Sequence, residues 1–513
     1  MRAVVLSSLF LAVACGPSDR PSHGLCDEGA DPRPEACAQA CDPLAANLCP
    51  DGFHCFPDGT CDQNCRQGLG DCGDGERCTN DGHCVPETQC TGLECDVVEC
   101  GATGGAPTTL TGQVFAPNGT MPLYGVNVYV PNEPLPAEVE GAVCDRCSAP
   151  LPGAPLTKVK TDANGMFTLA NVPAGVPFQL VVTTGKWRRV VDMPAVAQCE
   201  TTAVEPELTR LPRNTSEGDM PRIAITTGAY DALECLVRRL GIDDTEFGVA
   251  GSAARIHLFA GGGDINRAPI SQFGAGFAGG SGAFPSATPF WADLDQLKQY
   301  DIVMMSCEGT QNANTKPQGA LNAMKLYADL GGRAFMTHWH NIWIEGATLP
   351  GGNGQKPAVW TDVAQWDDVG TVFTTPPDTI DEINNPKGTA FADWMLGVMG
   401  SPAGQRGVIP LQTDTGRQTV TGLTDGRAER WVYWNNLGHE YPQMFQFTTP
   451  NEAPANDRCG KVVFSDMHVS DGPVANTTTF PESCGTTTEL SPQEKALAFM
   501  FFDVASCVDD VIL

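Results

Sequence analysis

The placement of cysteine constrains this chain more than any other feature of its sequence. Of the 22 cysteines in 513 residues, 13 lie within residues 26–100, a segment with very few large apolar side chains. Such a segment cannot build a hydrophobic core and needs disulfide bonds to hold a single fold. So many thiols also suit an oxidising compartment outside the cytosol. The sequence therefore predicts an exported protein with a small disulfide-rich module at residues 26–100.

An internal repeat runs through this module. The segments CPDGFHCFPDGTC (49–61) and CGDGERCTNDGHC (72–84) share the pattern C-x-D-G-x-x-C-x-x-D-G-x-C. Each Asp-Gly pair favours a tight turn, so the repeat predicts two small hairpins held by disulfides. The pattern resembles the EGF-like or Dickkopf-like modules of extracellular proteins. A zinc cluster is disfavoured, because C-x-x-C pairs are absent from this module.

The first residues read MRAVVLSSLFLAVACG, an apolar run too short to span a bilayer. The run AVAC resembles a bacterial lipobox, which implies a signal peptide at 1–15, lipidation of Cys15 and a polar tether at 16–25. The lipid bilayer is then a partner, and the protein is expected at the outer membrane or cell surface. The periplasmic face of the membrane is the alternative location. Plain signal cleavage is the alternative. Without Cys15 the chain keeps an odd number of cysteines, so one thiol is free or joins another chain in self-association.

The charge of the chain limits its partners. The formal net charge is −30, so no basic surface is available to neutralise the phosphates of a nucleic acid. The rest of the sequence contains no run of about 18 apolar residues, the length that would predict a membrane-spanning helix. The composition therefore indicates an exported protein that does not bind nucleic acid.

Residues 108–206 alternate apolar and polar residues between Pro, Gly and Asn turns, as in TGQVFAPNG, VNVYVPN, GMFTLANVP and PFQLVVTTG. The order of these runs is similar to the carboxypeptidase-regulatory-like, transthyretin-like β-sandwich family, through Gly112, Val114, Thr161–Phe167 and Val172–Gly175. The resemblance implies a spacer, stalk or adhesion module without peptidase chemistry. Within this region, Cys144-Asp-Arg-Cys147 predicts either a local disulfide or a bridge to Cys199.

Residues 219–513 alternate between strand-like and helix-like segments. Buried apolar strands separated by helices predict an α/β doubly wound (flavodoxin-like) domain with a parallel sheet. The expected strands are 222–228, 255–263, 300–309, 333–340 and 461–472, and the expected helices are 231–240, 294–299 and 318–330.

Polar residues recur at the C-terminal ends of these strands, where such folds place their sites. The candidates are Thr227, Asp231, Glu308, His338, Trp339, His340, Asn341, Asp466 and His468.

These candidates leave three uses open. On a continuing strand, His338 and His340 would face one side and could join His468 in holding a divalent metal, with Asp466 or Glu308 as an added carboxylate. Water bound to that metal would serve hydrolysis.

In the second use, the site binds a sugar ligand, with Trp339 or Trp343 stacked on the sugar ring. The ligand-binding residues are then His338, Trp339, His340, Asn341, Thr227 and Asp231. In the third, both histidines cap a buried strand end. No compact motif such as H-E-x-x-H supports the metal.

The segments YDIVMMSCEG, GGRAFMTHWH and GKVVFSDMH are similar in order to the class I glutamine-amidotransferase-like superfamily over about 220–480, especially its ThuA-like (trehalose-utilisation-like) branch. True amidotransferases carry a nucleophilic cysteine between glycines after the fourth strand, where this chain has Thr337-His338-Trp339. Glutaminase chemistry is therefore not implied. The ThuA-like branch implies a carbohydrate-related role, with His338 at the histidine of that branch and residues 345–460 as an insertion.

These features together predict a surface lipoprotein whose C-terminal domain binds a carbohydrate or cell-envelope ligand without amidotransferase activity. A metal-assisted hydrolase or sugar-modifying enzyme is one alternative, and a structural or adhesive scaffold is another. Cys307 ends the third strand and could act as a nucleophile beside Glu308. A disulfide between Cys235 and Cys307 is favoured instead, because both lie near the same end of the sheet in an oxidising compartment.

Overall fold

The computed structural model describes most of the chain beyond residue 90. The described residues are 49, 53–55, 61–62, 65, 72, 76–79, 84–86, 90–100, 105–346, 358–367, 372–373, 377–412, 416–468, 477–486 and 489–508. The predictions for the signal peptide, Cys15 and the tether lie outside these residues. The chain divides into two compact units, one of residues 1–91 and 99–106 and the other of residues 92–98 and 107–513. Within the described residues, no helix has the length and apolar character needed to cross a membrane.

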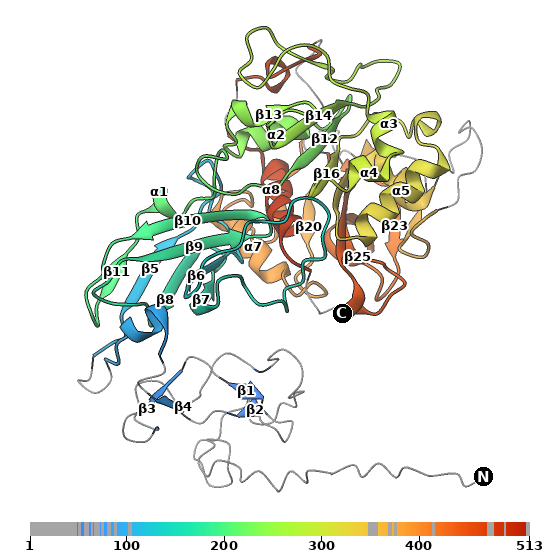
Figure 1. The fold of residues 1–513 in the computed structure, drawn as a ribbon. Coiled ribbons are helices and arrows are strands. Elements are labelled where there is room, and N and C mark those ends of the chain that lie inside the picture. Colours follow the sequence, from blue (N-terminus) through green and yellow to red (C-terminus); the bar gives the residue numbers. More distant parts are fainter. Residues whose placement is uncertain are drawn as a thin grey trace, which may run out of the picture. The chain divides into compact units, whose positions relative to one another are not determined.

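The N-terminal unit contains two antiparallel hairpins, one in each repeat (Figure 1). Disulfides Cys49–Cys61 and Cys72–Cys84 occupy equivalent places in the two repeats, and each closes a separation of 12 residues. A third disulfide joins Cys65 to Cys78. The predicted disulfide-rich region is confirmed. The hairpins are formed by β1 (His54–Cys55) with β2 (Cys61–Asp62) and β3 (Glu76–Cys78) with β4 (Cys84–Pro86).

The larger unit begins with two β-sheets, in the strand orders β10-β9-β6-β7 and β11-β5-β8 (Figure 1). Successive side chains of a strand point to opposite faces of its sheet, so one face can be buried and the other exposed. On β8, Phe167 and Leu169 are buried while Met166 and Thr168 are exposed. The strands are β5 (Thr109–Gln113), β6 (Asn127–Pro131), β7 (Pro155–Lys160), β8 (Met166–Ala170), β9 (Phe178–Thr184), β10 (Trp187–Met193) and β11 (Thr201–Ala203), followed by α1 (Pro206–Thr209).

The same unit contains a ten-stranded sheet in the order β13-β14-β12-β16-β17-β26-β25-β24-β20-β21. The first six strands are parallel, and the rest pair antiparallel. These strands are β12 (Ile223–Thr227), β13 (Phe247–Gly248), β14 (Ile256–Ala260), β16 (Ile302–Met305), β17 (Arg333–Thr337), β20 (Asp378–Ile380), β21 (Val408–Ile409), β24 (Glu429–Asn436), β25 (His439–Thr449) and β26 (Gly460–Ser465).

Two hydrophobic cores lie on opposite faces of this sheet. Along β16, Ile302 and Met304 belong to one core, while Val303 and Met305 belong to the other. Burial on both faces explains the continuous apolar runs of the central strands. The helices are α2 (Leu233–Arg239), α3 (Ala287–Trp291), α4 (Leu294–Leu297), α5 (Gln318–Asp329), α6 (Ile342–Glu345), α7 (Gly388–Gly397) and α8 (Pro492–Ala505). Short strand pairs complete the unit: β15 (Gln272–Phe273) with β27 (Thr479–Phe480), β18 (Ala364–Trp366) with β23 (Val420–Leu423), and β19 (Val372–Phe373) with β22 (Gly416–Arg417).

The disulfides of the larger unit differ from those predicted. Cys144 pairs with Cys459 and Cys147 pairs with Cys507, so C-x-x-C forms neither a local bond nor a bridge to Cys199. The segment after β6 thus lies against the ends of distant elements, a proximity that sequence spacing does not reveal.

The predicted Cys235–Cys307 disulfide is also wrong, because Cys235 bonds to Cys484. Cys307 is a free cysteine in the described part of the chain and is fully buried. Self-association through an unpaired cysteine therefore finds no support at Cys307.

Candidate functional site

The chain turns sharply where β17 ends. Thr337 is the last residue of the strand, and His338 begins a short 3-10 helix (His338–Asn341) that leads into α6. His338 has a φ of 38°, in the left-handed region that a non-glycine residue rarely adopts. The strand therefore does not continue through His340, and the expectation that both histidines face one side is wrong.

The turn places His338 among side chains from two other strand ends. His338 Nδ1 lies 2.9 Å from Nε2 of His468, which follows β26, and 3.6 Å from Sγ of Cys307, which follows β16. The sulfur and the two ring nitrogens all lie within 4.8 Å of one another. Adjacent parallel strands β16, β17 and β26 thus bring one cysteine and two histidines to a single point, because their C-terminal ends share one edge.

Asp231 adds a carboxylate to this cluster. It follows β12 with a φ of 55°, and its Oδ1 lies 3.7 Å from Nδ1 of His468. A carboxylate at this nitrogen favours the Nδ1–H tautomer, which leaves the Nε2 lone pair of His468 directed at His338. His338 Nε2 has no hydrogen-bond partner among the described residues. Two non-glycine residues of positive φ therefore shape the site.

The cluster is shielded from water. Cys307 and Asp231 have no exposed surface, and His338 and His468 are 3% and 2% exposed. Burial, followed by the nearby Asp231 carboxylate, raises the pKa of the Cys307 thiol above its ordinary value. Burial, followed by the Arg417 charge, lowers the pKa of both histidines well below the ordinary value. The resting site therefore holds a neutral thiol and two neutral imidazoles.

This arrangement does not favour the thiol as a nucleophile. A reactive cysteine needs its thiolate stabilised and accessible, whereas Cys307 is buried and its pKa is raised. Neutral imidazole nitrogens and a cysteine sulfur are instead the donors that bind zinc and similar ions.

His340 and Asn341 are separate from the cluster. His340 Nε2 donates to the Ser306 carbonyl oxygen, and its Nδ1 accepts a hydrogen bond from Nε1 of Trp343, each at 2.9 Å. Both ring nitrogens are thus used within the core, so His340 is not placed as a metal ligand. Asn341 donates to the buried carboxylate of Glu345.

The carboxylates expected to assist a metal have other partners. Glu308 Oε2 lies 2.6 Å from the Lys316 ammonium. Asp466 accepts hydrogen bonds from both the backbone N–H and the hydroxyl of Thr419. Burial raises the pKa of Asp466 to about 6. The structure does not bring either carboxylate into the cluster.

The predicted sugar-binding residues are mostly enclosed. Thr227 donates to the carbonyl oxygen of Ile270 and has no exposed surface. Trp339 is half-buried, with its ring centroid 4.5 Å from that of His338. A sugar ring cannot contact the buried side chains in this conformation.

Sequence reasoning assigned Cys307 to a disulfide and treated Asp231 only as a ligand-binding residue. Their positions carried a signal, since both follow strands that join the central parallel sheet. Residues that follow neighbouring parallel strands therefore indicate which side chains meet at the site, in addition to the two histidines of one segment.

Comparisons with known proteins add little. No family model matches the chain, and no curated protein matches it significantly. Two crystal structures of mutants of a type II cohesin–X–dockerin complex from Acetivibrio cellulolyticus are similar over part of the chain, at 14% and 16% identity. They cover 29% and 26% of this chain and 79% and 85% of their own, with TM-scores of 0.14 and 0.15. Likeness at this level supports no argument about fold or function.

Proposed function

We propose that the C-terminal part of this protein binds a divalent transition-metal ion through Cys307, His338 and His468. The spacing of the donor atoms carries the proposal. A tetrahedral zinc ion separates two nitrogen donors by about 3.3 Å and a sulfur from a nitrogen by about 3.6 Å, given its usual bond lengths. The corresponding separations here are 2.9 Å and 3.6 Å. The third separation, between Cys307 Sγ and a ring nitrogen of His468, is within 4.8 Å, so the three donors are close enough to share one ion after adjustment of the side chains.

The donor set also selects the kind of ion. Sulfur and imidazole nitrogen favour zinc or copper over magnesium and calcium, which prefer oxygen. Asp231 acts from outside the donor set: it orients His468 through Nδ1, as carboxylates commonly do for metal-bound histidines. The ion would displace the proton from the Cys307 thiol on binding.

Enclosure of the site favours binding over hydrolysis. A catalytic zinc keeps an open position for water and substrate, whereas all three donors here are buried. We therefore propose a metal-binding protein and keep the metal-assisted hydrolase as the alternative. Sugar binding at the same strand ends would need the buried side chains to become exposed.

We propose for the surrounding chain an amidotransferase-like, doubly wound domain at 219–513, lacking the amidotransferase nucleophile, after a carboxypeptidase-regulatory-like sandwich at 108–206. The six parallel strands covered by two cores support this assignment. We also propose export, which the disulfides of both units support. Anchoring through lipidated Cys15 is proposed from the lipobox-like run AVAC.

Metal titration tests the proposed site. Metal-free protein titrated with Co²⁺ should develop a thiolate-to-cobalt charge-transfer band and visible bands of a tetrahedral ion. His468→Gln should weaken binding, and Cys307→Ser should abolish the thiolate band. His439→Gln is the matched control, because His439 is an exposed histidine on β25. Absence of the band in folded protein, or its persistence in Cys307→Ser, would overturn the proposal.

A further inference from the structure

A large polar cleft lies where the first β-sheets meet the end of α2, apart from the histidine cluster. Its volume is about 1070 Å³, which is sufficient for a small oligosaccharide. Its lining includes Asn118, Arg210, Arg213, Arg238 and Asp243. All of these residues belong to one compact unit, so the cleft is part of a single body.

Arginine is concentrated in this cleft, although the protein has 61 acidic and 31 basic residues. Four arginines and three carboxylates line it, and Glu217 and Glu494, which are not lining residues, also pair with these arginines. The arginines are Arg210, Arg213, Arg238 and Arg239, and the carboxylates are Glu207, Asp243 and Asp244. Guanidinium groups gathered in one place offer their remaining N–H donors to an oxyanion.

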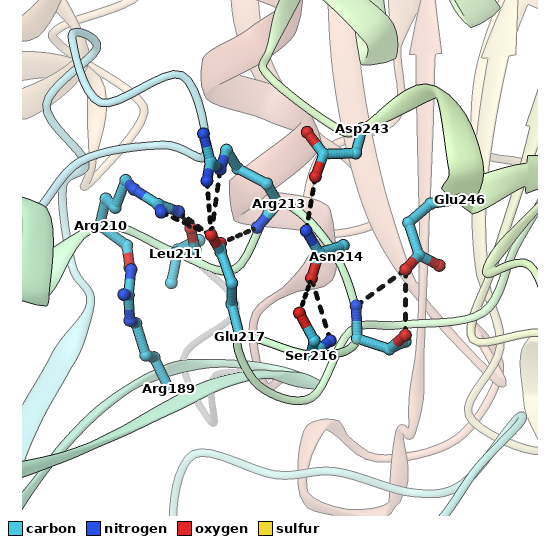
Figure 2. A network of polar contacts seen from close by, with 10 residues as sticks. Arg189, Arg210, Leu211, Arg213, Asn214, Ser216, Glu217, Asp243 and Glu246 are labelled. Atoms are coloured by element: carbon cyan, nitrogen blue, oxygen red, sulfur yellow. Dashed lines mark hydrogen bonds and ion pairs between the residues drawn. The ribbon is translucent and has the colours of Figure 1, made fainter. Parts of the chain in front are cut away.

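Carboxylates fix the orientation of these guanidinium groups. Figure 2 shows Arg210 and Arg213 converging on Glu217, at 2.6 Å and 2.7 Å. The Arg210 hydrogen bonds hold the pKa of Glu217 well below its usual range. Arg238 is held in the same way by Asp244, through Nε and Nη2.

Arg213 and Arg238 each keep one N–H donor group that the paired carboxylate does not use. Among the described residues, Nη1 of Arg213 and Nη1 of Arg238 have no hydrogen-bond partner. The two side chains are 46% and 34% exposed. Two oriented cationic donors therefore remain available to a ligand in the cleft.

Tightly packed backbone borders the cleft. Gly241 has a φ of 97°, and a Cβ atom there would come within 2.3 Å of the Asn118 backbone nitrogen, so these two segments meet backbone to backbone. The Asn118 N–H also donates to the Leu240 carbonyl oxygen. Cys484, which lines the cleft, is bonded to Cys235 of α2. A rigid site loses little conformational entropy when a ligand binds.

We propose that this cleft binds an acidic oligosaccharide, a sugar chain that carries carboxylate or phosphate groups. Arg213 and Arg238 bind the oxyanions, Glu207 and Asp243 accept hydrogen bonds from sugar hydroxyls, and the Asn118 side-chain NH₂ donates to a sugar oxygen. Carboxylates and an amide beside the arginines distinguish this lining from a simple phosphate site.

Calorimetry on the full chain at low salt tests the proposal with four probes: trigalacturonate, a phosphorylated trisaccharide, maltotriose and inorganic phosphate. We expect one or both acidic sugars to bind and maltotriose and phosphate to bind at least about tenfold more weakly. The two acidic probes distinguish carboxylate from phosphate recognition.

Variant controls assign any binding to the cleft. Arg213→Gln combined with Arg238→Gln should weaken binding of the acidic sugar by about tenfold or more. Arg406→Gln is the matched control, because Arg406 is 36% exposed and also paired with two carboxylates, but lies outside the cleft lining. Failure of both acidic sugars to bind, equal binding of phosphate or maltotriose, or unchanged binding in the double variant would overturn the proposal.

Discussion

Glu308 and Lys316 form an ion pair that is almost completely removed from water. Their side chains are 1% and 0% exposed, and Lys316 Nζ lies 2.6 Å from Glu308 Oε2. The ammonium also donates to the Gln311 carbonyl oxygen and lies 4.8 Å from the ring centroid of Trp291. Glu308 accepts further hydrogen bonds from Asn312 and the Gly262 backbone. Each charge therefore depends on the other for its compensation.

Glu308→Gln should lower the free energy of unfolding by about 3–5 kcal/mol, because it keeps the shape and leaves a buried cation unpaired. Burial already lowers the pKa of Lys316, and only Glu308 opposes that effect strongly. Without Glu308, the folded-state pKa of Lys316 falls further below the unfolded value. The unfolded state of the variant then binds more protons, so its stability rises as pH rises.

Urea unfolding of four proteins measures this effect: the parent, Glu308→Gln, Lys316→Met and the double variant. The double variant should be more stable than Glu308→Gln, because no unpaired charge remains. The deficit of Glu308→Gln relative to the parent should shrink between pH 7 and pH 10. A cost below about 1 kcal/mol, or a deficit that does not change with pH, would refute the reasoning.

Three other predictions concern separate parts of the chain. At His338, the Gly variant should be about 1 kcal/mol more stable to urea than the Ala variant, because both lose the ring and only Ala is strained at positive φ; equal stability would contradict this. Replacing both Cys235 and Cys484 by Ala should cost about 2–4 kcal/mol, because the bond closes a separation of 249 residues, and non-reducing urea unfolding measures the loss; a cost near zero would show that the unfolded chain gains little freedom. Burial, with the Arg222 charge, lowers the pKa of His257 to about 4, so the unfolded state takes up the proton first and stability falls as pH drops from about 6.5 to 4. His257→Gln should show a loss that is smaller by roughly 2–3 kcal/mol, as measured by unfolding at pH 7 and pH 4.5, and parallel pH profiles would argue against it.

Strand positions in the larger unit were predictable because burial on both faces leaves a continuous apolar run. The runs at 222–228 and 300–309 contain β12 and β16, each shorter than its run by residues at the ends, and the run at 461–472 overlaps β26, which begins one residue earlier at Gly460. The Asp-Gly repeat likewise predicted the two N-terminal hairpins. Both signals are local, so a single sequence carries them.

Partners far apart in the chain were not predictable in the same way. Cys144 and Cys459 are 315 residues apart, and their pairing depends on how the first sheets pack against the ten-stranded sheet. The histidine cluster shows both cases: the strand-end rule placed His338 and His468 on one edge. The turn at His338 then separated it from His340, because a positive φ is not evident from residue type.

The Cys144–Cys459 and Cys147–Cys507 bonds have a mechanical consequence for a chain held at its N-terminus. When such a chain is pulled from its C-terminal end, the tension runs from residue 107 to Cys147 and then passes through the disulfide to Cys507. The backbone between these two residues is then outside the path of the force, so the sheet and the histidine cluster bear little load. A protease that cuts between residues 148 and 458 would leave both pieces covalently joined, and the protein would keep its parts after such damage.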